Sequence, residues 1–172
     1  INTDLANDLG NLVSRTTAMA EKYFGGKLPG GCSATPEERA LAEGCGKEGC
    51  IGVTVEPGDT ACDVELIALV SGLRNRYEEQ MEKFQFQNAL EEIFKVIGRA
   101  NKYIDENAPW TLAKDPANRA RLATVMYNLL ETIRICAVLL TPFIPDSAEK
   151  IFDQIGACPC CRTWEKANVW GS

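Results

Sequence analysis

The strongest constraint in this sequence is a helical repeat of apolar residues that stops just before a proline. Apolar side chains recur at steps of three and four, the spacing of one buried helical face, at Phe86, Leu90, Ile93, Phe94, Ile97, Ala100 and Ile104. The repeat predicts a helix over residues 85–107. Pro109 has no backbone N–H and disfavours the α conformation of the residue before it, so we expect Trp110 to begin a non-helical connector. The spacing alone leaves two roles for Trp110, a plug at the end of the core or a stacking platform.

Similar repeats predict helices over residues 2–24, 60–84 and 146–155. A further long helix should begin with Asp115 as its N-cap and Pro116 at its first position, and should end at Pro142 and Pro145. Its apolar face comprises Leu122, Val125, Met126, Leu129, Leu130, Ile133, Ala137 and Leu140. These elements predict a single all-α domain over residues 1–172, a bundle of four to five helices.

Residues 27–62 differ in composition and predict an irregular Gly/Cys-rich insertion. Thr35 and Pro36 indicate the start of a short helix that reaches Glu43, and alternating apolar residues at 51, 53 and 55 indicate one isolated strand. Residues 44–49 match the G-x-G-x-x-G pattern. A dinucleotide site needs a strand before that turn and a helix after it, and the order here is reversed, so we reject it.

Composition excludes several classes of function. The chain contains no histidine, which removes Ser-His-Asp and Cys-His nucleophiles and histidine-ligated metals. The longest apolar run, residues 135–144, is far shorter than the ~20 residues of a membrane span. We therefore expect a cytoplasmic protein without membrane contact. The net charge is −6, but residues 27–65 hold eight acidic and three basic residues, so a local basic surface remains possible elsewhere.

The first predicted helix carries a polar face that includes Asn11 and Arg15, which are neighbours at a four-residue spacing. The planar donor fork of Arg and the mixed donor and acceptor of Asn suit them to hydrogen-bond the edge of a nucleic-acid base. The alternative is a solvated helix face in which Arg15 pairs with an acid one turn away.

The tail contains Cys158, Pro159, Cys160 and Cys161. Cys158 and Cys161 have the C-x-x-C spacing of a metal site, and without histidine a zinc site would need two more thiols from Cys32, Cys45, Cys50 and Cys62. Those four include no second C-x-x-C. In a chain without secretory features we expect ordinary reduced thiols and no bound metal.

An ordered set of motifs resembles the C-terminal anticodon-binding domain of methionyl-tRNA synthetases. The matching stretches are Asn7–Arg15, Met81–Leu90, Asn101–Asp105 with Pro109-Trp110, Leu140–Pro145 and Val169–Gly171. The resemblance covers most of the chain but does not account for residues 27–62.

The resemblance implies a helical domain of a class I aminoacyl-tRNA synthetase that binds the anticodon stem-loop of methionine tRNA. Asn11, Arg15 and Trp110, with Pro109 before it, occupy the family's anticodon-binding positions, and the loop read would be CAU. The partners implied are tRNA and the catalytic domain of the parent enzyme, which uses ATP with Mg²⁺. The class I catalytic motifs HIGH and KMSKS are absent, so the chain should need no cofactor and be inactive alone.

Three alternatives remain open at this point. The chain could be the related domain of another class I synthetase, although the pairing of Asn11 and Arg15 with Pro109-Trp110 argues against it. A helical protein-interaction module would bury Trp110. A cysteine-based metal module would use the thiols at Cys158 and Cys161.

Overall fold

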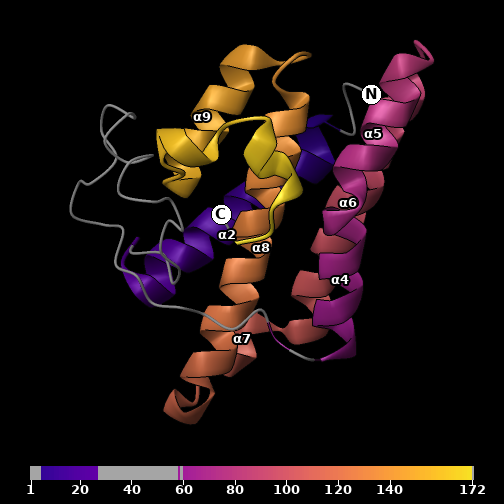
Figure 1. Ribbon diagram of the computed structural model, residues 1–172. Helices are drawn as coiled ribbons and strands as arrows, with labels where there is room; N and C mark the ends of the chain where they lie inside the picture. The colour runs from indigo at the N-terminus through magenta and orange to yellow at the C-terminus, as the bar shows by residue number, and fades with distance from the viewer. Residues whose placement is uncertain (1–4, 27–57, 59, 172) are drawn as a thin grey trace.

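The computed structural model describes residues 5–26, 58 and 60–171, and these form a bundle of helices (Figure 1). A π-helical turn, Leu5–Leu9, leads into α2. The α-helices are α2 (Gly10–Phe24), α4 (Ala61–Ser71), α5 (Leu73–Glu82), α6 (Phe86–Asn107), α7 (Pro109–Leu112), α8 (Arg119–Leu140) and α9 (Pro145–Ile155). Short 3₁₀ helices occupy Pro116–Asn118, Pro159–Cys161 and Glu165–Asn168, and the described residues contain no strand. The predicted all-α class is confirmed.

Several predictions fall outside the described residues. These are the short helix ending at Glu43, the strand over residues 51–55, and the G-x-G-x-x-G stretch, together with Cys32, Cys45 and Cys50.

Helix α8 is the central element of the bundle. It contacts α2, α4, α6, α7 and α9, and Figure 1 shows α4, α5 and α6 on one side of it and α9 on the other. The C-terminal tail packs against α8 and also against α5, where Trp164 contacts Tyr77 and Arg74. Every residue from Leu129 to Leu140 is buried. The segment Pro116–Leu140 is apolar and long enough to cross a membrane, but 83% of its most apolar window is buried inside the bundle. Its apolar surface is therefore used in packing against its neighbours.

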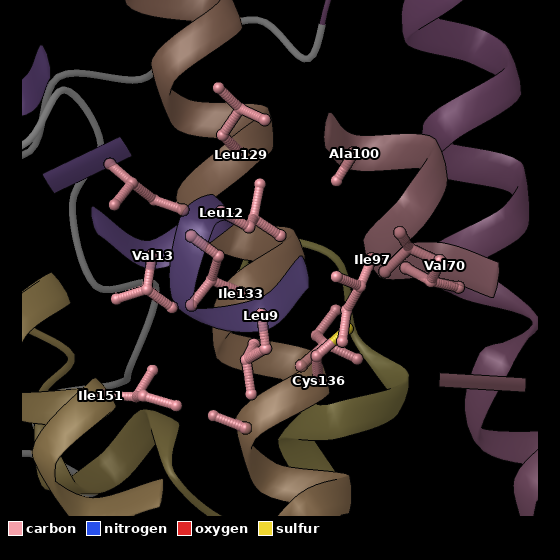
Figure 2. Close-up of a cluster of buried hydrophobic side chains, with 14 of the residues drawn as sticks. Leu9, Leu12, Val13, Val70, Ile97, Ala100, Leu129, Ile133, Cys136 and Ile151 are labelled. Atoms are coloured by element: carbon pink, nitrogen blue, oxygen red, sulfur yellow. The ribbon is translucent and has the colours of Figure 1, made fainter. Parts of the chain in front are cut away.

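The core lies between α8 and the helices around it. Figure 2 shows Leu12 and Val13 of α2 meeting Leu129 and Ile133 of α8, with Ile97 of α6 close by. All five side chains are buried. Burial of each such side chain contributes about 1.5–3 kcal/mol, which makes this cluster the main source of stability.

The predicted helix ends at Phe24, Asn107 and Ile155 hold, and the predicted start at residue 2 lies outside the described residues. The helix predicted to open at Pro116 begins as the 3₁₀ turn Pro116–Asn118, capped by Asp115, and α8 follows from Arg119.

The other differences lie in the α4–α6 region. The helix expected over residues 60–84 is two helices, because α4 ends at Ser71 and α5 starts at Leu73. Phe86, predicted to be buried, is 48% exposed, and its ring packs edge-on against exposed Phe84 at 6.3 Å. Phe86 is the first residue of α6, where the α5–α6 pair projects beyond its neighbours, so the helical repeat continues past the core that it serves.

The connector after α6 is helical, which corrects the prediction of a non-helical segment at Trp110. Helix α6 ends at Asn107 as expected, and Ala108 adopts the left-handed conformation at φ 43° and ψ 63°. Pro109 then starts the single turn α7, in which the Ala113 N–H donates to the Pro109 carbonyl at 2.9 Å. Proline is favoured at a first helical position, so the residue that ends α6 also begins α7.

A buried carboxylate, Asp63, joins three helices. It lies near the start of α4 and accepts hydrogen bonds from the hydroxyl of Tyr103 in α6 and from the guanidinium of Arg121 in α8. The side-chain amide of Asn128 in α8 donates to it at 3.3 Å. Asp63 also completes a capping box with Thr60, whose backbone N–H donates to Asp63 Oδ2 at 3.2 Å. One carboxylate therefore caps α4 and fixes α4 against α6 and α8.

The surroundings of Asp63 fix its charge. Burial by itself would raise the pKa of Asp63, but the hydrogen bond from Arg121, with those from Thr60 and Tyr103, holds the pKa below its ordinary value. Gly58 passes so close that a Cβ there would stand 2.4 Å from Asp63 Oδ2. Asp63 is thus a buried carboxylate that is ionised at neutral pH, with its compensating partners already in place.

A second buried ion pair attaches the C-terminal tail to α8. Arg134 and Glu131 pair within α8, and their side chains are only 4% and 7% exposed. The Arg134 guanidinium also donates to the backbone carbonyls of Cys161, Lys166 and Val169 at 2.8, 3.1 and 3.0 Å. The tail after α9 is therefore held by one arginine with several acceptors.

We predict that Asp63→Asn lowers the free energy of unfolding by about 3 kcal/mol, because it leaves the Arg121 guanidinium without its counterion. A folded-state pKa below the unfolded one means that the unfolded state binds more protons near pH 4. This part of the stability is therefore present above the unfolded pKa of about 4 and is lost as the pH falls toward the folded value. Urea unfolding between pH 3 and 7 measures both effects.

Asp146→Asn is the matched control, since Asp146 is an exposed carboxylate in the first turn of α9. It should cost under about 1 kcal/mol. Equal costs for the two variants, or an unchanged acid dependence in Asp63→Asn, would contradict the assignment of Asp63 as the junction.

Candidate nucleic-acid interface

Trp110 is presented outward by the turn α7. The inward residues of the turn are Pro109, which is buried, and Leu112, which packs against the core. Trp110 between them is 45% exposed. The left-handed Ala108 costs about 1–2 kcal/mol for a residue with a Cβ, so the turn is held by its surroundings. The indole is therefore an exposed ring on a fixed base, which favours the stacking role over the core plug.

The polar face of α2 lies along the same end of α6. Arg15 Nη2 donates to Asp105 Oδ1 at 2.7 Å, five residues before Trp110. About one turn before Asp105 in α6, the side-chain amide of Asn101 donates to the backbone carbonyl of Asp8 at 3.1 Å. Asn11 lies between Asp8 and Arg15 on this face and is exposed. The acid that pairs with Arg15 thus belongs to another helix, not to the next turn of α2 as the alternative supposed.

The start of α8 completes the site. The Arg119 guanidinium lies over the Phe24 ring, 5.2 Å from its centroid, and so joins the end of α2 to the start of α8. Lys114, in the link between α7 and α8, is exposed, as is Arg119. Two exposed cations therefore follow the turn that carries Trp110, with the exposed Asp115 between them in the sequence.

The base of the site is fixed by Arg121. Its Nη2 donates to the side-chain oxygen of Asn107, the last residue of α6, while the same guanidinium binds Asp63. The Asn107 amide in turn donates to the Tyr103 carbonyl at 2.9 Å. The end of α6 is therefore joined to α4 and α8, and α7 follows after Ala108.

Sequence reasoning did not single out Asp105, Asn107, Arg121 or the cations Lys114 and Arg119. Arg121 and Asp63 are 58 residues apart, and Arg15 and Asp105 are 90 apart. No local signal marks such pairs. The proximity of Lys114 and Arg119 to Trp110 in the sequence was the one available indication.

The cysteines lie elsewhere in the fold. Cys158 and Cys161 are brought together in the tail after α9, with their sulfur atoms 2.9 Å apart. Cys62 is in α4 and makes no part of this group.

The arrangement suits recognition of an unpaired base. An exposed indole offers a stacking surface, Asn11 offers an amide donor and acceptor, and Arg15 offers a donor fork already oriented by Asp105. Burial raises the pKa values of Tyr103 and Cys136, and both side chains lie inside the core.

Comparison with known proteins assigns the family. Residues 55–169 match the family model described as the anticodon binding domain of methionyl tRNA ligase. A methionine–tRNA ligase of Caldanaerobacter subterraneus is 46% identical over 165 residues, which is 96% of this chain and 22% of that protein. That of Bacillus subtilis is 40% identical over 172 residues, 99% of this chain and 22% of that protein. The chain spans about a fifth of the length of these relatives.

The fold also matches solved structures. Methionyl-tRNA synthetase of Mycobacterium tuberculosis, bound by methionyl-adenylate, aligns with a TM-score of 0.78 and 33% identity, covering 100% of this chain and 30% of that one. Its free form aligns with a TM-score of 0.78 and 32% identity. Sequence and structure agree on one family, and the ordered motifs around Asn11, Arg15 and Trp110 lie within the shared region. This chain belongs to the anticodon-binding domains of methionyl-tRNA ligases.

Proposed function

We propose that this chain binds the anticodon stem-loop of methionine tRNA and reads its CAU loop with Trp110, Asn11 and Arg15. The observation that carries the proposal is the exposed indole of Trp110 on a turn fixed from below by Pro109 and Leu112. The interaction-module alternative required a buried Trp110, and 45% exposure argues against it.

Stacking supplies the affinity. A single-stranded loop can turn its bases outward, and a base stacked on an indole gains about 1–3 kcal/mol. Because every base has a flat face, stacking alone discriminates weakly. Trp110 would therefore anchor one base of the loop, and Pro109 would act only by shaping the turn.

Hydrogen bonds supply the discrimination. Asn11 is exposed and its amide makes no side-chain hydrogen bond within the described residues, so it is available for a base edge. Arg15 is held by an exposed ion pair with Asp105, whose side chain is 64% exposed. Such a pair is worth at most about 1 kcal/mol, so Arg15 can keep or exchange this partner when RNA binds at small cost.

The phosphate backbone would be held by Lys114 and Arg119. Both are exposed beside α7, and neither forms an ion pair within the described residues. Contacts to phosphate orient an RNA without reading its sequence. This separates the residues that position the loop from those that read it.

The parent protein is inferred to be a methionine–tRNA ligase that uses ATP and Mg²⁺ in a catalytic domain outside this chain. Anticodon contacts made here would contribute to kcat/KM by positioning the acceptor end of the tRNA in the distant active site. The chain alone should show no ATP–pyrophosphate exchange above background.

The proposal predicts that the chain prefers a CAU hairpin over one with its first anticodon base changed. Trp110→Ala should weaken CAU binding by about 1–3 kcal/mol, roughly five- to 150-fold. Asn11→Ala and Arg15→Ala should mainly reduce the difference between the two hairpins. Fluorescence anisotropy at one fixed salt concentration measures all of these affinities.

Two variants serve as matched controls. Phe84 is an exposed aromatic residue near the other end of α6, and Lys22 is an exposed cation later in α2. Phe84→Ala and Lys22→Ala should leave the preference for CAU intact. The proposal fails if both hairpins bind alike, or if Phe84→Ala is as harmful as Trp110→Ala.

The proposal also predicts how Trp110 responds to RNA. In a Trp164→Phe and Trp170→Phe background, Trp110 emission should be quenched readily by acrylamide and become protected when the CAU hairpin is added. The control is a chain that retains Trp164 as its one tryptophan. The centroid of the Trp164 ring lies 5.8 Å from that of Tyr77, and its emission should not change when RNA is added. Protected emission from Trp110 before RNA is added would show a buried indole.

Lys114→Ala should weaken both hairpins equally, because a lysine that binds phosphate reads no sequence. The slope of log K against log salt should fall by about 0.7–1, because the variant neutralises one fewer phosphate. Binding measured across a salt series tests this. A selective weakening of the CAU hairpin would instead place Lys114 among the residues that read the loop.

A further inference from the structure

The C-terminal tail gathers three thiols that anticodon binding does not use. The sulfur atoms of Cys158, Cys160 and Cys161 all lie within 4.8 Å of one another. Cys158 and Cys160 are half-buried, and Cys161 is buried. Spacing in the sequence pairs Cys158 with Cys161, and the structure adds Cys160 to them.

One pair of the three sulfur atoms already has the spacing of two ligands on one metal ion. Tetrahedral Zn²⁺ with Zn–S bonds of about 2.3 Å separates its sulfur ligands by about 3.8 Å. Cys160 and Cys161 have sulfur atoms 3.7 Å apart. The 2.9 Å between the Cys158 and Cys161 sulfurs is well above the ~2.05 Å of a disulfide and would open by about 1 Å around a metal.

The backbone that carries the thiols is already fixed. Cys158 precedes the 3₁₀ helix Pro159–Cys161, and the Cys161 N–H donates to the Cys158 carbonyl at 2.9 Å. On one side, Arg134 Nη1 donates to the Cys161 carbonyl at 2.8 Å. On the other, Arg162 donates to the Ala157 carbonyl at 2.8 and 3.0 Å. Little ordering cost remains for a ligand at the three sulfurs.

The chemistry of the group favours a soft cation. Thiolates select zinc and Cu(I) over hard cations. We propose that Cys158, Cys160 and Cys161 supply three thiolate ligands to a soft d¹⁰ cation such as Zn²⁺. This departs from the sequence expectation of ordinary thiols, which did not consider Cys160. Binding displaces up to three protons to solvent and joins the residues of the tail turn.

The test uses the full chain, reduced and freed of metal, and titrated with Co²⁺ without oxygen. The absorbance of a thiolate-to-cobalt charge-transfer band should rise until one Co²⁺ has been added per chain. The band should disappear when Zn²⁺ displaces the Co²⁺. Cys158→Ser and Cys161→Ser should each weaken binding by at least about tenfold. Cys62→Ser is the matched control and should bind like the wild type. No band, or equal weakening in Cys62→Ser, overturns the proposal.

Two further measurements keep the result interpretable. A chain with Ser at positions 32, 45 and 50 should retain the band, and its disappearance would contradict a site made by the three tail thiols. In the wild type, Zn²⁺ should release more than one proton per ion near pH 7, measured with a pH indicator, which requires no variant to fold. Release of one proton or fewer contradicts a multi-thiolate site. Hairpin affinity is measured in parallel, because failure of anticodon binding would leave the metal result unaffected.

Discussion

The relative position of α4, α6 and α8, the helices beneath the candidate site, depends on one buried carboxylate. Asp63 caps α4 and at the same time accepts hydrogen bonds from Tyr103 in α6 and Arg121 in α8. A desolvated charge is tolerated only where its partners are arranged around it in advance. Three helices must therefore reach their final positions together for this charge to be satisfied. The apolar core supplies most of the stability, and Asp63 selects one relative placement of helices that apolar packing alone leaves less defined.

This placement extends to the surface through Arg121. The guanidinium that neutralises Asp63 also binds the Asn107 side chain at the last residue of α6. Two residues later Pro109 is buried, and Trp110 stands exposed on the turn that follows. A stacking platform is effective when the ring keeps its position without the base, because binding then incurs little further ordering. The buried Asp63–Arg121–Asn107 network is therefore continuous with the turn that presents Trp110. This continuity explains why a rigid polar network lies close to the proposed binding surface.

Local signals in the sequence predicted the helices, while contacts between distant residues could not be predicted. Pro109, Asp115 and Pro145 mark helix ends by their own backbone chemistry, and the end of α6 and the start of α9 followed from them. Asp115 caps the 3₁₀ turn Pro116–Asn118, and α8 begins only after that turn. Periodicity shows which face of a helix is apolar but not how far the neighbouring helices extend. The prediction that Phe86 is buried was therefore wrong. The exposure of Trp110 and the Asp63–Arg121 pair depend on packing across tens of residues. The resemblance proposes Asn11, Arg15 and Trp110 as the site residues, and the structure shows how Asp105 and Arg121 hold their surroundings.

The Arg15–Asp105 pair shows how a weak interaction can matter to recognition. Both side chains are substantially exposed, at 39% and 64%, so water and salt screen their attraction and the pair adds little to folding. Its effect is geometric, because the carboxylate restricts a long side chain that otherwise samples many rotamers. A guanidinium restrained in this way loses less entropy when it meets a base, and Asp105 places a negative charge that disfavours phosphate at this point. In the proposed complex Arg15 is thereby directed toward base edges, while the cations Lys114 and Arg119 are left to hold the RNA backbone.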